Sequence, residues 1–172
     1  MTERLLGAII AGGRSRRFGS DKAAAVVDGR TLLEHVAGGL APRVASLVLC
    51  GREWPGFESL SDRPAPDLGP LGGLCAALHH AAARGYSHVV AAPVDVFPFP
   101  GDIVPRLVAQ RPRVVAGQYM IGAWPAGLAD ALENHLRKGH RSVRSWIEAA
   151  RAEYRDCETA LSNINYRSDL SE

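Results

Sequence analysis

The chain has 172 residues, of which 47% are hydrophobic, and its formal net charge at pH 7 is only +2. A chain of this length and composition can bury a substantial core, so we expect a single domain over residues 1–172. The small net charge argues against nucleic-acid binding, and no stretch approaches the roughly 20 apolar residues needed to cross a bilayer. We therefore expect a cytoplasmic protein that binds neither nucleic acid nor membrane.

Short apolar segments alternate with helical patterns along the chain. Strands are predicted over residues 5–10, 46–50, 88–92 and 113–116, and helices over 31–40, 71–84, 102–110, 126–138 and 142–151. Thr31 and Ser142 are predicted N-caps, and Gly85 and Gly139 are predicted to follow helix C-termini. The pattern indicates an α/β fold with three layers, Rossmann-like, around a mostly parallel sheet.

The first predicted strand leads into an unusual loop. Residues 9–23 read Ile-Ile-Ala-Gly-Gly-Arg-Ser-Arg-Arg-Phe-Gly-Ser-Asp-Lys-Ala. Gly12, Gly13 and Gly19 can take positive φ and bring backbone N–H groups close to an anion. The cations that would neutralise a phosphate are Arg14, Arg16, Arg17 and Lys22.

Two common phosphate loops are excluded by spacing. Lys22 comes too late after the glycines for a P-loop, and no Gly-x-Gly-x-x-Gly occurs here. The alternative is a strand followed by a turn whose arginines are merely solvated. The residue types favour a phosphate-binding loop, and hence a nucleotide ligand.

Further polar residues follow other predicted elements. In a mostly parallel sheet, ligands bind at the carboxyl ends of the strands, where the glycine-rich loop, Cys50, Asp62 and Asp95 would all emerge. Asp95 could bind Mg²⁺ or could cap a helix or turn, and Asp62 could contact ligand or form an Asx turn. We favour the metal role for Asp95 and leave Asp62 open.

The cysteines and histidines indicate no metal centre. Three cysteines, odd in number and without a Cys-x-x-Cys pair, are typical of thiols in a reducing cytoplasm. His79 and His80 are adjacent in a predicted helix and should point to different faces. Neither a disulfide framework nor a zinc site is predicted.

Four motifs together resemble a known family. From Ala11 the chain reads Ala-Gly-Gly-x-Ser-x-Arg-Phe-Gly-x-Asp-Lys, which is similar to the signature of the molybdenum cofactor guanylyltransferase (MobA) family. Asp62 stands seven residues before Gly69-Pro70-Leu71-Gly72-Gly73-Leu74, Asp95 ends an apolar run, and Asn163-Ile164-Asn165 matches a C-terminal Asn-x-Asn. The resemblance spans nearly the whole chain.

The resemblance implies a nucleotidyltransferase fold and an enzyme that transfers GMP from GTP to molybdenum-bound molybdopterin. Gly12-Gly13 favours guanine over cytosine among the relatives. Partners implied are GTP, the molybdenum cofactor, and cofactor-delivery proteins and molybdoenzymes. The implied catalytic residues are Arg17, Lys22 and Asp95, with Mg²⁺ on Asp95. The implied nucleotide-binding residues are Ile10, Ala11, Gly12, Gly13, Ser15, Gly19, Lys22, Cys50, Asp62, Gly69 and Asp95.

The chain departs from the family pattern at three places. Cys50 stands where better-known members carry asparagine, Phe97 where proline is expected, and Gln118-Tyr119 where a His-Pro pair is often found. These departures keep alternatives open. The acceptor could be another phosphorylated molecule, the donor could be CTP, or the chain could be a noncatalytic nucleotide- or cofactor-binding module.

Two further groups of residues have competing interpretations. Cations surround a predicted helix junction, where they could stabilise a helix C-terminus or bind the phosphate of the acceptor; they are Arg137, Lys138, His140, Arg141 and Arg144. Trp124 and Trp146 could stack on a pterin or pack in the core. We favour the structural role for both groups.

Overall fold

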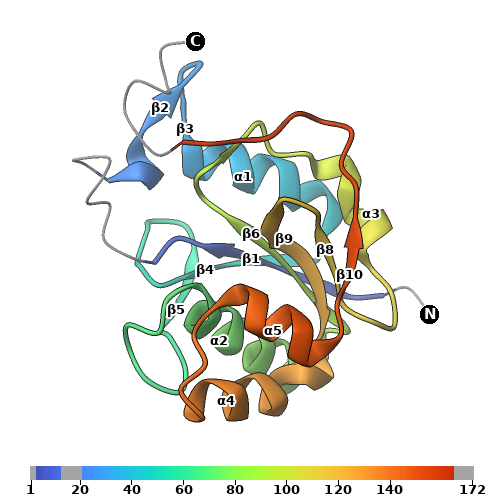
Figure 1. Ribbon diagram of the computed structural model, residues 1–172. Helices are drawn as coiled ribbons and strands as arrows, with labels where there is room; N and C mark the ends of the chain where they lie inside the picture. The colour runs from blue at the N-terminus through green and yellow to red at the C-terminus, as the bar shows by residue number, and fades with distance from the viewer. Residues whose placement is uncertain (1–2, 13–20, 165–172) are drawn as a thin grey trace.

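The computed structural model describes residues 3–12 and 21–164 (Figure 1). Its centre is a seven-stranded sheet in the order β10-β8-β9-β6-β1-β4-β5. All neighbouring strands are parallel except those that pair with β9, which is antiparallel to both β6 and β8. The strands are β1 (Leu5–Ile10), β4 (Ser46–Cys50), β5 (Glu58–Leu60), β6 (His88–Pro93), β8 (Arg113–Val115), β9 (Gln118–Pro125) and β10 (Glu153–Arg155).

Helices cover both faces of this sheet, as Figure 1 shows. Helices α1 (Leu32–Leu40) and α3 (Val104–Leu107) pack on one face, and α2 (Pro70–Ala83), α4 (Ala129–Arg137) and α5 (Val143–Ala150) on the other. The short elements are η1 (Lys22–Ala24), η2 (Ala41–Arg43), η3 (Gly101–Ile103), η4 (Ala126–Leu128), β2 (Val26–Val27), β3 (Arg30–Thr31), β7 (Val96–Phe97) and β11 (Ser162–Asn163). None of the described helices has the length and apolar character needed to cross a membrane. The predicted three-layer, mostly parallel α/β fold is confirmed.

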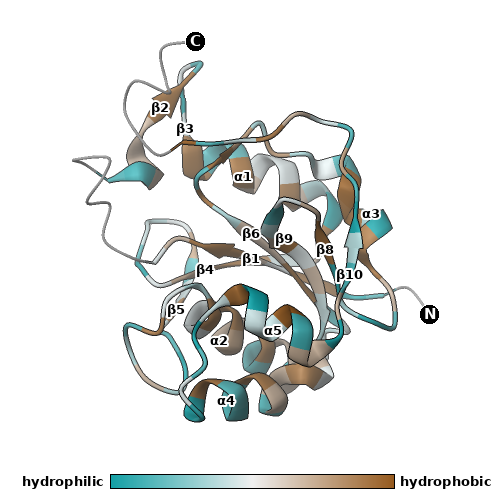
Figure 2. Ribbon diagram, viewed as in Figure 1, coloured by the Kyte–Doolittle hydropathy of each residue, from teal (hydrophilic) through white to brown (hydrophobic). Residues whose placement is uncertain are grey.

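The central strands are apolar throughout because both faces of the sheet are covered. In β1, Leu6, Ala8 and Ile10 face α2, while Ile9 faces the core under α1. Figure 2 shows these strands as the hydrophobic centre of the molecule, with hydrophilic residues on the outer helix surfaces. Burial of two faces explains why these strands are continuous apolar runs in the sequence.

The predicted helix boundaries agree with the capping residues. The Thr31 side chain accepts a hydrogen bond from the Glu34 N–H at 3.1 Å, and the Glu34 carboxylate accepts one from the Thr31 N–H at 2.7 Å, a complete capping box. Ser142 caps α5 by accepting from the Ser145 N–H at 3.1 Å. Gly85 and Gly139 take φ of 75° and 94° just beyond the C-cap residues Arg84 and Lys138 of α2 and α4, as predicted.

One predicted helix was wrong in its length, and one long strand was missed. The helix expected over residues 102–110 is only η3 followed by α3, and Val108 is already extended. The carbonyl of Ala109 accepts a hydrogen bond from Nε2 of buried His88 at 2.8 Å, a contact with the sheet that replaces the next helical turn. Strand β9 was not predicted. It returns antiparallel from β8 through a turn in which Gly117 has a φ of 80°.

The strand register brings the predicted site together. Ile10 at the end of β1 pairs with Cys50 at the end of β4 and with Pro93 at the end of β6, and Cys50 pairs with Leu60 of β5. The loops after all four strands therefore leave the sheet at one edge. Because α1 and α2 cover opposite faces, a crevice opens between these loops, as expected for an open parallel sheet.

Candidate active site

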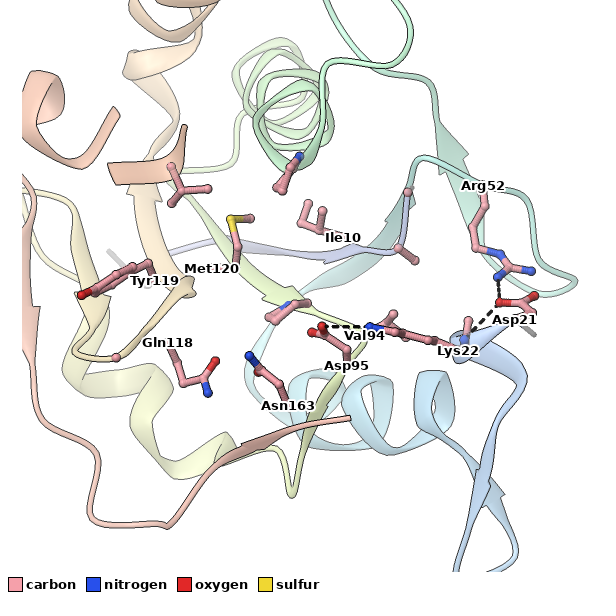
Figure 3. Close-up of a pocket in the computed structure, with 17 residues that line it drawn as sticks. Ile10, Asp21, Lys22, Arg52, Val94, Asp95, Gln118, Tyr119, Met120 and Asn163 are labelled. Atoms are coloured by element: carbon pink, nitrogen blue, oxygen red, sulfur yellow. Dashed lines mark hydrogen bonds and ion pairs between the residues drawn. The ribbon is translucent and has the colours of Figure 1, made fainter. Parts of the chain in front are cut away.

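A cleft of about 450 Å³ lies at this carboxyl edge (Figure 3). Its walls come from the ends of β1 and β6, the turn η1, the loop after β4, the start of β9, and β11. Charged side chains line one half, where Asp21, Lys22, Arg52 and Asp95 lie. The other half is formed largely by apolar and aromatic side chains of β9 and α5.

Lys22 and Asp95 face one another across the charged half. The Lys22 ammonium lies 3.6 Å from a carboxylate oxygen of Asp95, and the side chains are 19% and 28% exposed (Figure 3). Turn η1 presents Lys22, and this turn is capped by Asp21, whose carboxylate accepts a hydrogen bond from the Ala23 N–H at 3.1 Å. Both predicted charges are therefore partly exposed within one cleft.

The backbone around Asp95 is held on two sides. The Val94 N–H donates to the Ile10 carbonyl at 3.3 Å, and the Asp95 carbonyl accepts from the Ile164 N–H at 2.6 Å. Strand β7 then pairs antiparallel with β11, although Phe97 replaces the expected proline. Among the described residues no helix begins at Asp95, so it does not cap a helix. It lies in the turn between β6 and β7, so the capping of this turn is the alternative that remains beside the metal role.

The first asparagine of the C-terminal Asn-x-Asn motif reaches the same place. Asn163 belongs to β11, pairs with Val96, and lines the cleft beside Asp95 (Figure 3). The sequence predicted this residue only as part of a motif. Long-range strand pairing is what brings it to Asp95.

Arg52 is a site residue that the sequence analysis missed. It follows β4 and forms a close ion pair with the Asp21 carboxylate, and its guanidinium carbon lies 4.9 Å from the centre of the Trp54 ring. The hydrogen bond from Arg52 is the main reason that the pKa of Asp21 lies below its ordinary value. The only sequence signal was its position just after a predicted strand.

A second cavity adjoins the cleft and is lined by Asp62, Gly69, Gly12 and Arg52, the last two shared with the cleft. The Asp62 carboxylate accepts from the Leu68 N–H at 3.2 Å, a longer-range contact than an Asx turn makes. Burial raises the pKa of the Asp62 carboxyl. The cavity therefore offers a carboxylate and backbone groups to a polar ligand.

The loops after β1 and β4 touch through their backbones. A Cβ on Gly51, where φ is 89°, would lie 2.5 Å from the Gly12 Cα, so position 51 requires glycine. A Cβ on Gly12 would lie 3.2 Å from the Gly51 Cα, which leaves little room there as well. The Cys50 carbonyl accepts from the Ala11 N–H at 3.0 Å. The Cys50 side chain is fully buried in the core on the α2 side of the sheet and lines neither cavity, and burial raises its thiol pKa to about 12.

Gln118 and Tyr119, which replace the His-Pro pair of relatives, line the apolar half of the cleft with Met120 and Val143 (Figure 3). A guanidinium nitrogen of Arg144 lies 3.4 Å from the Tyr119 hydroxyl oxygen, and its guanidinium carbon lies 5.6 Å from the ring centre. A cation therefore stands at this end of the cleft as well.

Two other cations of the helix junction make structural contacts. Arg137 pairs with Glu133 at 2.7 Å, and Arg141 donates to the Leu136 carbonyl at the end of α4. Trp124 and Trp146 stack at 5.9 Å between ring centres and are buried. The structural interpretation is confirmed for these residues, and Arg144 is the exception.

One group of ligand-type side chains lies outside the cleft. Cys75, His79 and Glu133 place their ligand atoms within 4.8 Å of one another between α2 and α4. Nε2 of His79 is 2.7 Å from the Glu133 carboxylate, which also binds Arg63 and Arg137. Two arginines already balance the Glu133 charge, so we interpret the group as an ion-pair network between helices.

Several predicted site residues lie outside the described part of the chain. They are Gly13, Ser15, Arg17 and Gly19 of the glycine-rich loop, and Asn165 of the C-terminal motif. The predicted site residues within the described part gather at the cleft or the second cavity, with the exception of the Cys50 side chain.

Comparison with known proteins agrees with this geometry. The chain is 37% identical over 185 residues to a molybdenum cofactor guanylyltransferase of Cereibacter sphaeroides, covering 98% of this chain and 94% of the relative. A second relative of that name, from Sinorhizobium fredii, is 36% identical over 159 residues, covering 81% and 72%.

Solved structures share the fold. Molybdopterin-guanine dinucleotide biosynthesis protein A from Archaeoglobus fulgidus superposes with a TM-score of 0.73 at 22% identity, covering 96% of this chain and 95% of the other. A 2-C-methyl-D-erythritol 4-phosphate cytidylyltransferase from Thermus thermophilus gives 0.70 at 18% identity, covering 95% and 94%. Residues 7–156 match the family described as the MobA-like NTP transferase domain, and the chain belongs to that family.

Proposed function

We propose that this protein transfers GMP from GTP to the phosphate of molybdenum-bound molybdopterin and releases pyrophosphate. The observation that carries the proposal is the Lys22–Asp95 pair, partly exposed in a cleft at the ends of β1 and β6. The names of the guanylyltransferase relatives support the choice of donor and acceptor.

The reaction needs no protein base. An oxygen of the acceptor phosphate attacks the α-phosphorus of GTP in line, and the bond from that phosphorus to the pyrophosphate oxygen breaks. A phosphomonoester has a second pKa near ~6, so its oxygens are already ionised at neutral pH. No histidine or cysteine lines the described part of the cleft, which agrees with catalysis by positioning and charge stabilisation.

Lys22 would neutralise charge on the transferred phosphoryl group and the leaving pyrophosphate. Family members generally use a divalent metal, and we propose Mg²⁺ for this chain. The Asp95 carboxylate fits this ion, because it is a hard oxygen ligand, partly exposed in the cleft. When bound, Mg²⁺ would reduce the negative charge of the triphosphate.

The second cavity suits the guanine base. Guanine carries two adjacent N–H donors, and a carboxylate such as Asp62 can accept from both. Gly12 and Arg52 stand between this cavity and the cleft. A nucleotide lying past them would place its base near Asp62 and its phosphates near Lys22.

The apolar half of the cleft suits the acceptor. Tyr119 and Met120 offer a surface for a planar pterin, on the far side of Asp95 from Arg52 (Figure 3), and Val143 also lines the cleft. Arg144 beside Tyr119 adds a positive charge for an anionic acceptor.

The direct test is pyrophosphate release by the purified protein with Mg²⁺. GTP, CTP and ATP are each offered with molybdenum-loaded molybdopterin and, in parallel, with a sugar phosphate. We expect release with GTP and molybdopterin only. Pyrophosphate release with CTP would show that the proposed donor is wrong, and release with the sugar phosphate would show that the proposed acceptor is wrong. Tight GTP binding without turnover would indicate a noncatalytic module.

A further inference from the structure

We propose that Arg52 is a positioning residue for nucleotidyl transfer, which acts by holding Asp21 and thereby directs Lys22 toward Asp95. The inference rests on the proposed function and adds a residue outside the motifs that define the site in the sequence. Its basis is a continuous series of contacts across the cleft.

The series alternates in charge and links three loops. Arg52 pairs with the Asp21 carboxylate, and the same oxygen accepts the Ala23 N–H at 3.1 Å. That hydrogen bond caps the turn that presents Lys22, and Lys22 reaches Asp95 at 3.6 Å. A displacement of Asp21 would therefore move the ammonium that faces the reacting phosphates.

Arg52 is well suited to hold Asp21 because its own position is set by the sheet. The preceding residue, Gly51, donates its N–H to the Leu60 carbonyl at 3.0 Å and packs directly on Gly12. Trp54 contacts the guanidinium from another side, at 4.9 Å from its ring centre. The interaction thus anchors turn η1, which lies beyond the glycine-rich loop, to the rigid end of β4.

Charge compensation is the second effect of Arg52. Without it, the Asp21 carboxylate would lose the ion pair that the described residues give it, in a cleft that must accept a polyanion. Arginine is favoured over lysine here because its planar fork donates to the carboxylate while its flat face contacts Trp54.

The location of Arg52 predicts which of the two substrates its loss affects. Arg52 lines both the cleft and the second cavity, whereas the apolar half near Tyr119 lies at the opposite end (Figure 3). Loss of Arg52 should therefore lower kcat/KM for GTP and leave the KM for the acceptor unchanged.

The test is a double-mutant cycle on Arg52→Met and Asp21→Asn, with Arg52→Lys as the conservative variant. If Arg52 acts through Asp21, each single variant should lower kcat/KM for GTP by about 30-fold, and the double variant should fall no more than about 3-fold below either single. Arg52→Lys should recover part of the loss. The matched control is Arg155→Met, which removes another arginine–carboxylate pair, 2.6 Å from Glu153, at the opposite edge of the sheet.

Losses that simply multiply in the double variant, or wild-type kinetics in Asp21→Asn, would overturn the proposal, since Arg52 would then act without Asp21. The same double-mutant cycle can be measured without turnover, by determining the GTP affinity of each variant by equilibrium dialysis in the absence of acceptor. If the wild type binds GTP but transfers nothing, the proposed function fails while the coupling of Arg52 and Asp21 is still tested. Circular dichroism of each variant checks that the fold is retained.

Discussion

The Lys22 ammonium lies 3.6 Å from the Asp95 carboxylate, although the two residues belong to different loops. Lys22 is presented by a capped turn beyond β1, and Asp95 by the loop that follows β6. Strands β1 and β6 are neighbours in the sheet, so the pairing of these strands brings the two charges together. In the proposed reaction, Lys22 can then act on the negative phosphates and Asp95 on the positive metal ion that accompanies them.

Lys22→Ala should reduce kcat by about 10²–10³-fold, because it removes a charge that stabilises the transition state. The melting temperature should change little, since a partly exposed ion pair contributes little stability. Pyrophosphate release and thermal denaturation measure the two quantities. Lys138→Ala, at an exposed lysine after α4, is the control. Activity of Lys22→Ala within a few-fold of wild type would remove Lys22 from the catalytic set.

Asp95→Asn should sharply reduce turnover at ordinary Mg²⁺ concentration, because an amide binds a hard cation more weakly than a carboxylate does. Raising Mg²⁺ or replacing it with Mn²⁺ should restore part of the activity. The measurement is initial rate against metal concentration, with Asp102→Asn, at an exposed aspartate in η3, as the control. An unchanged metal dependence would show that Asp95 is no ligand.

Asp62→Asn should weaken discrimination of GTP from ATP by about 10-fold or more, since the amide cannot accept both guanine N–H groups. It should also raise stability slightly at neutral pH. Burial raises the pKa of the Asp62 carboxyl above its ordinary 3.8, so the folded state holds this proton more tightly and loses stability as pH rises through that range. The stability difference between variant and wild type should disappear below pH 3.8. Competition binding and denaturation at several pH values test both effects.

Arg144→Ala should raise the KM for the acceptor several-fold and leave the KM for GTP unchanged, because Arg144 stands beside Tyr119 at the apolar end of the cleft. Tyr119→Ala should have the same selectivity, with Arg111→Ala, at an exposed arginine before β8, as the control. Steady-state kinetics with each substrate varied in turn give the two KM values. Equal effects on both substrates would place the acceptor elsewhere.

His135 should make the protein less stable in mild acid. Burial, and then the nearby His140 and Lys138, lower the pKa of His135 below 6.5, so the unfolded chain binds its proton more readily than the folded chain. Its contribution to stability is complete above pH 6.5 and is lost as pH falls through the lowered value. Denaturant midpoints between pH 7.5 and 5 should decline in the wild type and decline less in His135→Gln. An identical decline in both would assign the acid sensitivity to other groups.

The local sequence was sufficient to predict features that depend on residues close together in the chain. The apolar runs of β1, β4 and β6 are long enough to identify a covered parallel sheet, and Thr31 and Ser142 cap helices through residues three positions away. The order of the motifs predicted the family, and the ends of the predicted strands predicted the edge of the sheet at which the site lies. These features need no knowledge of what packs against them.

Tertiary structure alone decided the rest, because long-range packing sets which side chains face the cleft. The β8–β9 hairpin delivers Tyr119 to one end, the pairing of β7 with β11 delivers Asn163 to the centre, and the contact of Gly51 with Gly12 delivers Arg52 to the other end. The Cys50 side chain is buried in the core on the α2 side of the sheet, where a Cβ on Gly73 would lie 3.0 Å from the Cys50 Cβ. A residue at a strand end can point to ligand or to core, and only the packed neighbours determine which.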